Sequence, residues 1–152
     1  MKKIFTWPAV IVAFFLLAAF SFWAKDEESV KPVLPILKTV KIGEVVLDIE
    51  VADTETERIK GLSEKEILEE NEGLLFVFDK GGYYGIWMKE MNFPIDIAWF
   101  DENKKITHIE NAVSPETYPK VFNSFTPSLY ILETNANFFV NHKIKIGDVA
   151  EF

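Results

Sequence analysis

The stretch "IWMKEMNFPIDIAWF", Ile86 to Phe100, predicts a strand at the centre of a β structure. After Pro94 the side chains alternate, with Ile95, Ile97 and Trp99 on one face and Asp96, Ala98 and Phe100 on the other. Both faces are largely apolar, which is typical of a strand covered on both sides. A carboxylate there must be paired or hydrogen-bonded, because burying an isolated charge is costly. Lys89 is the nearest candidate partner for Asp96, and Arg58 is the second.

Upstream of this strand, "TVKIGEVVLDIEVA" (residues 39–52) predicts a hairpin or bent strand pair around Gly43. Thr54 and Glu57 then form the pattern of a capping box, and Gly61 predicts a helix stop about two turns later. Ser63 and Glu66 repeat the capping pattern, so a second short helix is expected there.

Further strands are predicted at "GLLFVF" (residues 73–78), at 84–88, on both sides of a polar turn in "IDIAWFDENKKITHIE" (residues 95–110), and at the start of "LYILETNANFFVNHKIKIGDVAEF" (residues 129–152). A short helix near Asn135 and a last strand after Gly147 and Asp148 close the chain. Asn111 to Ser128 lacks periodicity and is expected to be a long loop pinned by Phe122 and Phe125, or a lid. The fold class predicted is mainly β: a small antiparallel β-sandwich or barrel with two or three short helices.

The N-terminus predicts a membrane segment. Lys2 and Lys3 precede the uncharged run Ile4 to Ala24, which is long enough as a helix to span a bilayer. Residues 1–24 therefore predict one N-terminal transmembrane helix acting as a signal anchor, or a cleaved signal peptide. Residues 25–38, with two prolines, predict a linker, and residues 39–152 an extracytoplasmic β-domain. The domain is secreted if the N-terminal segment is cleaved.

Composition excludes several classes of function. The formal net charge of −8 argues against a nucleic-acid binder, since a phosphate backbone requires a cationic face. The absence of cysteine excludes disulfides and thiolate chemistry. His108 and His142 are isolated and show no metal-binding spacing. We expect neither a metal nor a cofactor.

Several segments in order carry a family resemblance: "VADTETERIKGLS" (residues 51–63), "GLLFVF" (73–78), "WMKEMNFPIDIAWFD" (87–101), "YILETNANFF" (130–139) and "IKIGD" (144–148). Together they resemble the family known as domain of unknown function 192. Glu90 and Met91 stand where the family pattern has asparagine and threonine, and Asn137 replaces a glycine. The resemblance implies a small β-rich barrel or sandwich, often exported or membrane-tethered, and no established activity.

Two interpretations of the polar residues in this apolar chain remain open. Lys89 and Asp96 could form a structural ion pair, or they could form the polar floor of a pocket walled by Trp87, Trp99 and Tyr84. The candidate site comprises Lys89, Asp96, Arg58, Glu133, Asp53, Trp87 and Trp99.

Arg58 and Asp53 are explained first by helix-start chemistry. Arg58 could also reach Asp96 or Glu133, which would gather one cation and two acids. Glu133 shares a strand face with Ile131.

These residues predict a binding module for a small molecule, a glycan or an envelope partner. The alternatives are a carboxylate-dependent hydrolase acting on envelope polysaccharide, which would use acids among Asp53, Asp96 and Glu133, and a protein-docking module. An exposed apolar patch of Tyr118, Phe122 and Phe125 would favour docking. No catalytic residue is assigned.

Overall fold

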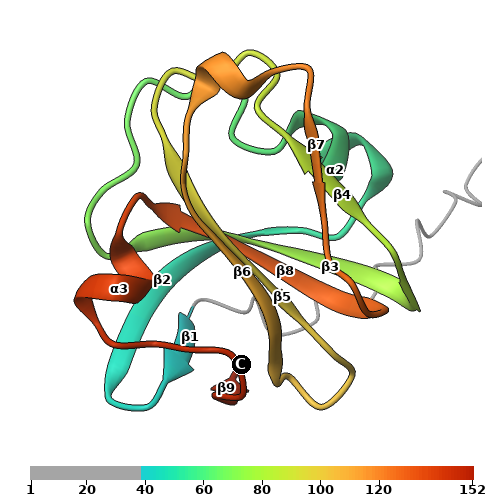
Figure 1. Cartoon of the computed structure of the whole chain (residues 1–152), viewed down its shortest axis with the longest axis vertical. Coiled ribbons are helices and arrows are strands. Elements are labelled where there is room, and N and C mark those ends of the chain that lie inside the picture. Colours follow the sequence, from blue (N-terminus) through green and yellow to red (C-terminus); the bar gives the residue numbers. More distant parts are fainter. Residues whose placement is uncertain (1–38) are drawn as a thin grey trace, which may run out of the picture. The chain divides into compact units, whose positions relative to one another are not determined.

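The computed structural model describes residues 39–152, which form a mainly β structure with two short helices (Figure 1). The predicted anchor at residues 1–24 and the predicted linker at residues 25–38 lie outside the described residues. Within the described part, neither helix has the length and apolar character needed to cross a membrane.

A curled seven-stranded sheet forms most of the structure, in the order β6-β5-β8-β3-β2-β1-β9. Its strands are β1 (Thr39–Ile42), β2 (Val45–Ala52), β3 (Glu72–Gly82), β5 (Ile95–Phe100), β6 (Ile106–Val113), β8 (Ser128–Asn135) and β9 (Ala150–Glu151). β4 (Gly85–Trp87) and β7 (Val121–Asn123) form a separate two-stranded sheet. The helices are α2 (Glu55–Lys60) and α3 (Phe138–Asn141), with a 3-10 turn, η1, at Pro115–Thr117.

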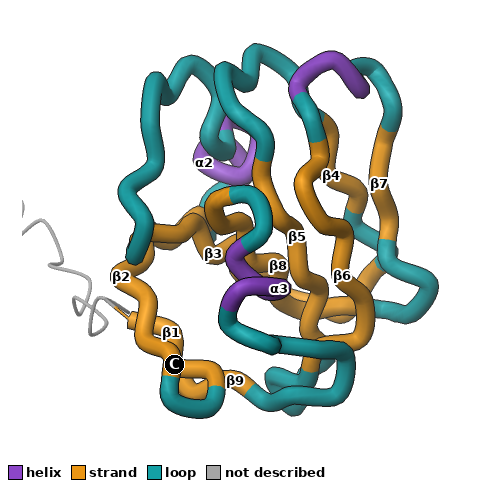
Figure 2. Tube along the Cα trace, turned by 60° about the vertical axis from the view of Figure 1, so that its left-hand side comes forward, coloured by secondary structure: helices purple, strands orange, loops and turns teal. Residues whose placement is uncertain are grey.

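The large sheet curls into a half-barrel whose two edges meet at one end. A bridge joins Lys105, before β6, to Val149, before β9. Backbone hydrogen bonds from Ile106 to Asp148 and from Gly147 to Ile106, each 2.9 Å, reinforce this contact. α2 and the β4–β7 sheet lie toward one end of the half-barrel, and α3 and β9 toward the other (Figures 1 and 2).

The prediction of an antiparallel sheet is wrong for one pair of strands. β2 and β3 are parallel, with Glu50 beside Leu74. The connection through α2 crosses from the end of β2 back to the start of β3, whereas a tight hairpin would have made the pair antiparallel. The expected hairpin around Gly43 is confirmed, because β1 and β2 are antiparallel neighbours there.

The two faces of β5, which lies between β6 and β8, belong to different cores. Ile97 and Trp99 belong to an apolar cluster with Phe76, Ile86 and Ile131. Ala98 and Phe100 belong to a second cluster that includes Leu75 and Phe139. The alternation predicted for residues 95–100 is therefore confirmed, and all six residues of the strand are buried.

The first capping box is formed as predicted. The Thr54 hydroxyl accepts a 3.2 Å hydrogen bond from the Glu57 N–H, and the Glu57 carboxylate accepts one of 3.0 Å from the Thr54 N–H. These bonds from Thr54 lower the pKa of Glu57. α2 ends at Lys60, and Gly61 follows with a positive φ of 50°, which glycine adopts readily. The fixed start and stop of α2 set the position of the loop that follows it.

Thr54→Ala should lower the free energy of unfolding by about 1 kcal/mol, because the Glu57 N–H loses its acceptor. Urea denaturation measures the change. Thr56→Ala, in the same exposed helix, is the matched control and should change the free energy of unfolding by only about a few tenths of a kcal/mol. Equal effects of the two substitutions would show that the cap contributes nothing beyond helix propensity.

The second predicted helix, at Ser63 to Glu66, is wrong: this segment forms turns. The Ser63 hydroxyl donates to the Lys89 carbonyl instead of capping a helix, and Glu64 has a φ of +64°. The Asn92 side chain donates to the Lys65 carbonyl at 3.0 Å. Contacts with the loop after β4 thus replace the local hydrogen bonds that a helix would need.

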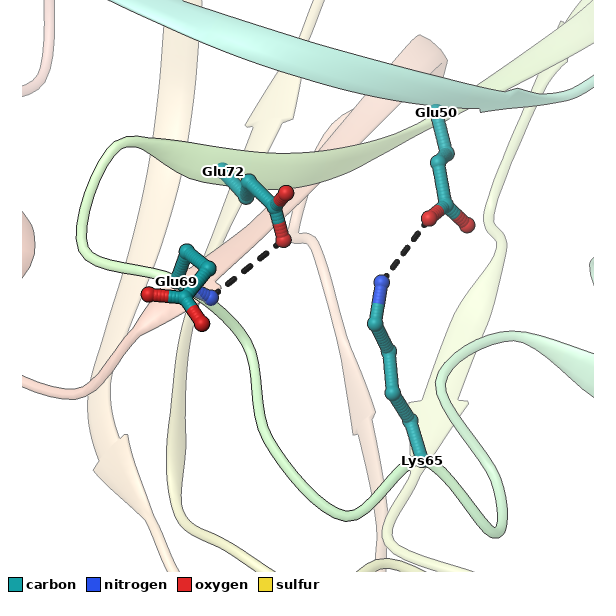
Figure 3. Close-up of polar contacts among 4 residues, drawn as sticks. All are labelled: Glu50, Lys65, Glu69 and Glu72. Carbon is teal, nitrogen blue, oxygen red and sulfur yellow. Dashed lines mark hydrogen bonds and ion pairs between the residues drawn. The ribbon is translucent and has the colours of Figure 1, made fainter.

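Further contacts attach this same loop to the large sheet (Figure 3). The Lys65 ammonium lies 2.8 Å from the Glu50 carboxylate on β2, and the Glu69 N–H donates to the Glu72 carboxylate at 3.3 Å. Asn135 on β8 donates to the carbonyls of Leu68 and Glu69. The loop after α2 is therefore anchored at both ends. This loop forms one side of the candidate site described below.

The predicted long loop from Asn111 to Ser128 contains regular structure. It holds the end of β6, η1 and the short strand β7. Phe122 is buried in the first core cluster and pins β7, as predicted, whereas Phe125 is 84% exposed. Of the three residues considered for a docking patch, Tyr118 and Phe125 are exposed and Phe122 is buried.

Candidate functional site

Asp96 is a fully buried carboxylate that holds three backbone segments together. It accepts hydrogen bonds from the N–H groups of Ala112 at 2.7 Å, Asn137 at 2.9 Å and Phe139 at 3.1 Å. These donors come from the end of β6, the residue before α3 and α3 itself. Asp96 therefore has the hydrogen-bonded environment that the sequence required, and its partners are backbone groups.

The expected pairing of Lys89 with Asp96 is wrong. Lys89 lies in the loop after β4, where its ammonium is 3.6 Å from the Glu90 carboxylate and its side chain is 45% exposed. Asp53 is also exposed, and its carbonyl accepts a hydrogen bond from Arg58. Neither residue contributes to a buried cluster.

Trp99 is a core residue and not a pocket wall. It is fully buried, and its indole N–H donates to the Tyr84 carbonyl at 3.0 Å. Tyr84 stacks on Phe78 with ring centroids 3.6 Å apart. The pocket expected around Lys89, Asp96 and Trp99 is therefore absent from the part of the chain described.

A different pocket brings together Glu133, Arg58 and Trp87 from the predicted site. It lies between the end of α2 with its following loop, β4, and β8. Its volume is about 50 Å³, enough for a few water molecules or one small chemical group. Phe76, Ser63 and Met91 also line it.

Glu133 is the polar residue that distinguishes this pocket. It is 4% exposed, and its Oε2 atom has no hydrogen-bond partner among the described residues. Its cross-strand neighbours are Leu74 on β3 and Ile97 on β5, both apolar. Burial raises the pKa of Glu133 to about 8, so the carboxyl group is mainly protonated at neutral pH. A buried polar atom without a partner costs free energy, and such an atom requires an explanation.

Arg58 lines the pocket, but it is bound elsewhere. Its Nη1 donates to the carbonyls of Val77, at 2.8 Å, and of Asp53. Its guanidinium carbon lies 5.2 Å from the centroid of the Phe78 ring. Among residues 39–152, no ion pair joins Glu133 to a basic side chain. The expectation that Arg58 could neutralise a buried acid is therefore not met.

Trp87 provides the aromatic surface of the pocket. Trp87 is one of the residues that line the pocket, and it is 47% exposed. The ring of Tyr118, 45% exposed, lies beside it with centroids 5.9 Å apart. A ligand group inside the pocket could thus continue over two exposed aromatic rings.

Asp96 and Glu133 do not face the same site. In the β5–β8 pair, Ile97 lies opposite Glu133, and Asp96 lies opposite Thr134. Consecutive residues of a strand point to opposite faces, so the two carboxyl groups lie on different sides of the sheet. The structure therefore gives the hydrolase hypothesis no carboxylate pair built from these two residues. Residues 39–152 also contain no group of three acidic or histidine side chains placed to hold a metal ion.

Sequence reasoning missed Ser63, Phe76 and Met91 as lining residues. The sequence pattern predicts Ser63 as a helix cap, and Phe76 lies in a segment whose apolar residues predict a buried strand. One sequence feature did indicate Glu133: it shares a strand face with the apolar Ile131, and an acid on such a face needs an explanation.

A family model described as "DUF192: Uncharacterized ACR" matches residues 38–152. The chain belongs to the DUF192 family. The resemblance drawn from the ordered segments is therefore confirmed. A comparison with curated proteins found no match.

Two solved structures are similar to this DUF192 domain. A protein of unknown function from Novosphingobium aromaticivorans DSM 12444 is 26% identical, with a TM-score of 0.71 over 75% of this chain and 84% of that one. A protein from Sinorhizobium meliloti 1021 described as a "putative transcription regulator" is 24% identical, with a TM-score of 0.71 over 74% of this chain and 91% of that one. At these identities the likeness concerns the fold and assigns no ligand to the DUF192 domain.

Proposed function

We propose that residues 39–152 form a binding module for a small molecule or a glycan, and that the ligand places one small group in the Glu133 pocket. The observation that supports this proposal is the buried Oε2 atom of Glu133, which has no hydrogen-bond partner within residues 39–152, in a residue that lines a pocket together with a half-exposed tryptophan. Ligand sites typically combine apolar and aromatic walls with a few placed polar groups.

The rest of the ligand would lie on the surface over Trp87 and Tyr118, because the pocket itself is small. Aromatic rings with one exposed face stack on apolar or sugar-like surfaces. The protein-docking alternative rests on Tyr118 and Phe125, whose exposure alone does not indicate a partner. We therefore place the binding function at the pocket.

We also propose that residues 1–24 tether this module to a membrane, with the module outside the cytoplasm. Support comes from the sequence: Lys2 and Lys3 precede an uncharged run that ends before Lys25. An envelope partner or an envelope glycan would then be within reach of the pocket. Protease protection of right-side-out membrane vesicles tests the topology, and a domain that is degraded only after lysis would contradict it.

The binding proposal is tested by a thermal-shift screen of the full chain against sugars and small metabolites. A ligand found in the screen should bind at least ten-fold more weakly to Trp87→Ala and to Glu133→Gln, because each substitution removes one of the two recognition groups. Tyr83→Ala, which removes another exposed aromatic ring, and Lys89→Met should leave the affinity unchanged. A ligand whose binding survives both pocket substitutions would place the site elsewhere.

A further inference from the structure

Resting on the proposed binding function, we propose that the group entering the Glu133 pocket is an alkylammonium cation, a primary or methylated amine, which pairs with the Glu133 carboxylate and lies against Trp87. The first support is the missing counter-charge. Glu133 is 4% exposed between the apolar Leu74 and Ile97, and its Oε2 atom is unpaired within residues 39–152. A cation is the ligand group that stabilises a buried carboxylate most strongly.

The basic residues beside the pocket do not supply that counter-charge. Arg58 and Lys60, both on α2, are the charged groups that line the pocket together with Glu133. Arg58 donates to two backbone carbonyls and lies over Phe78, and Lys60 is exposed. The lining residues from β3 and β4, which include Phe76 and Trp87, are uncharged. Within the described part of the chain, the acid therefore has aromatic and apolar neighbours and no ion pair with a basic side chain.

Trp87 suits the same class of ligand. The face of an indole ring attracts ammonium groups more strongly than any other side-chain ring, and methylated amines are recognised by such faces. Trp87 lines the pocket while remaining half exposed, so its ring is accessible to a ligand, and Tyr118 extends the aromatic surface. A neutral sugar could also stack on these rings, so the rings alone do not distinguish a sugar from a cation. The buried acid is the feature that favours a cation.

The charge of the surrounding chain favours a cation as well. From Glu44 to Glu72 the sequence has eleven acidic residues and three basic ones, and this segment includes the part of the pocket wall formed by α2 and its loop. One of the three basic residues, Lys65, is paired with Glu50 (Figure 3). The other two basic residues, Arg58 and Lys60, line the pocket, but the net charge of the segment is negative, and a net negative charge attracts cations and repels anions such as carboxylates at longer range.

Binding of a cation should release one proton. Burial raises the pKa of Glu133 to about 8 in the free protein, so below that pH the carboxyl must lose its proton before it can form the ion pair. The affinity for an alkylammonium ion should therefore rise about ten-fold per pH unit up to about pH 8 and then level off. A neutral hydroxyl group bound by the protonated acid would not show this rise.

The test is an NMR titration of the full 152-residue chain, following the backbone amide signals of Ser63 and Glu133 in the pocket, with n-butylammonium chloride and with n-butanol, its neutral analogue. Sodium chloride keeps the ionic strength constant, and the dissociation constant is measured at pH 6.5, 7.5 and 8.5. We expect butylammonium to bind with the stated pH dependence and at least ten-fold more tightly than butanol at pH 8.5.

Two variants with a matched control separate the possible outcomes. Glu133→Gln should abolish both the preference for the cation and its pH dependence, and Trp87→Leu, at an exposed position, should weaken the cation more than butanol. Glu70→Gln removes one exposed acid and should change neither.

If both probes bind equally well, independently of pH, and if this binding depends on Glu133, the proposal of a cationic ligand is wrong but the proposal of a binding module stands. If neither probe nor any compound of the screen acts through Glu133, both proposals fail.

Discussion

Asp96→Ala should lower the free energy of unfolding by about 4 kcal/mol, because three backbone N–H groups lose their acceptor at once. The donors belong to segments far apart in the sequence, at Ala112, Asn137 and Phe139. The hydrogen bond from the Phe139 N–H to Asp96 is buried. Urea denaturation of the variant and the natural chain at neutral pH measures the difference.

Asp96→Asn tests the same point more gently, since the side chain keeps one oxygen and loses the negative charge. It should cost about 2 kcal/mol, because hydrogen bonds to charged groups are stronger than those to neutral ones. Asp48→Ala, at an exposed position of β2, is the control and should change stability by less than about 0.5 kcal/mol. A loss below 1 kcal/mol for Asp96→Ala would mean that water replaces the carboxylate and that Asp96 does not hold the three segments.

The Asp96 environment shows what the sequence could and could not predict. Alternation along Ile95 to Phe100 identified a buried acid that needed partners, and this was right. Lys89 was the wrong partner, because a search along the chain finds charged side chains but not backbone N–H groups. Backbone N–H groups are free to donate to a side chain only where strands and helices end, as they do at Ala112 and Asn137. Both of these residues have a positive φ.

Local signals predicted local structure well. The Thr54 capping box, the Gly61 stop and the turn at Gly43 each depend on a few adjacent residues, and each is present. The second capping pattern failed because the outcome depended on a distant loop: Ser63 bonds to Lys89, twenty-six residues away. The parallel pairing of β2 with β3 likewise depends on how a whole connection folds, which periodicity does not report.

The sequence predicted only some residues of the candidate site, because the site also depends on contacts between distant parts of the chain. Glu133, Arg58 and Trp87 were chosen as acid, cation and aromatic wall, and one pocket contains all three. The same chemical reasoning predicts four further site residues that lie elsewhere: Asp96, Trp99, Lys89 and Asp53. The type of residue could be read from the sequence, but the face of the sheet on which each residue lies depends on strand register.

Glu133→Gln should make the stability of the protein less dependent on pH between about 5.5 and 7.5. The pKa of Glu133 is about 8 in the folded state and is 4.5 for an ordinary glutamate. The folded state therefore binds a proton that the unfolded chain has lost. The stability from this proton is complete below about pH 4.5 and is lost as the pH rises toward 8. The natural chain should lose about 1.4 kcal/mol per pH unit relative to Glu133→Gln.

Urea denaturation of both chains at pH 5.5, 6.5 and 7.5 measures this difference, and Glu70→Gln is the control because Glu70 is exposed. His108 and His142 are present in every chain, so their contributions cancel in the comparison. Parallel curves for the natural chain and Glu133→Gln would show that the carboxyl is already ionised and satisfied in the folded state. That result would contradict both the protonated buried acid and the proposal of a cationic ligand.

A saturating alkylammonium ligand connects this stability measurement with the binding proposal. When the cation is bound, the Glu133 carboxyl is ionised in the folded state, as it is in the unfolded chain above about pH 5.5. The extra proton is then absent, so the excess pH dependence of the natural chain over Glu133→Gln should disappear. Butanol should leave that excess in place, because it does not require an ionised acid. Loss of the pH dependence with butylammonium but not with butanol would thus identify Glu133 as the group that exchanges its proton for the cation.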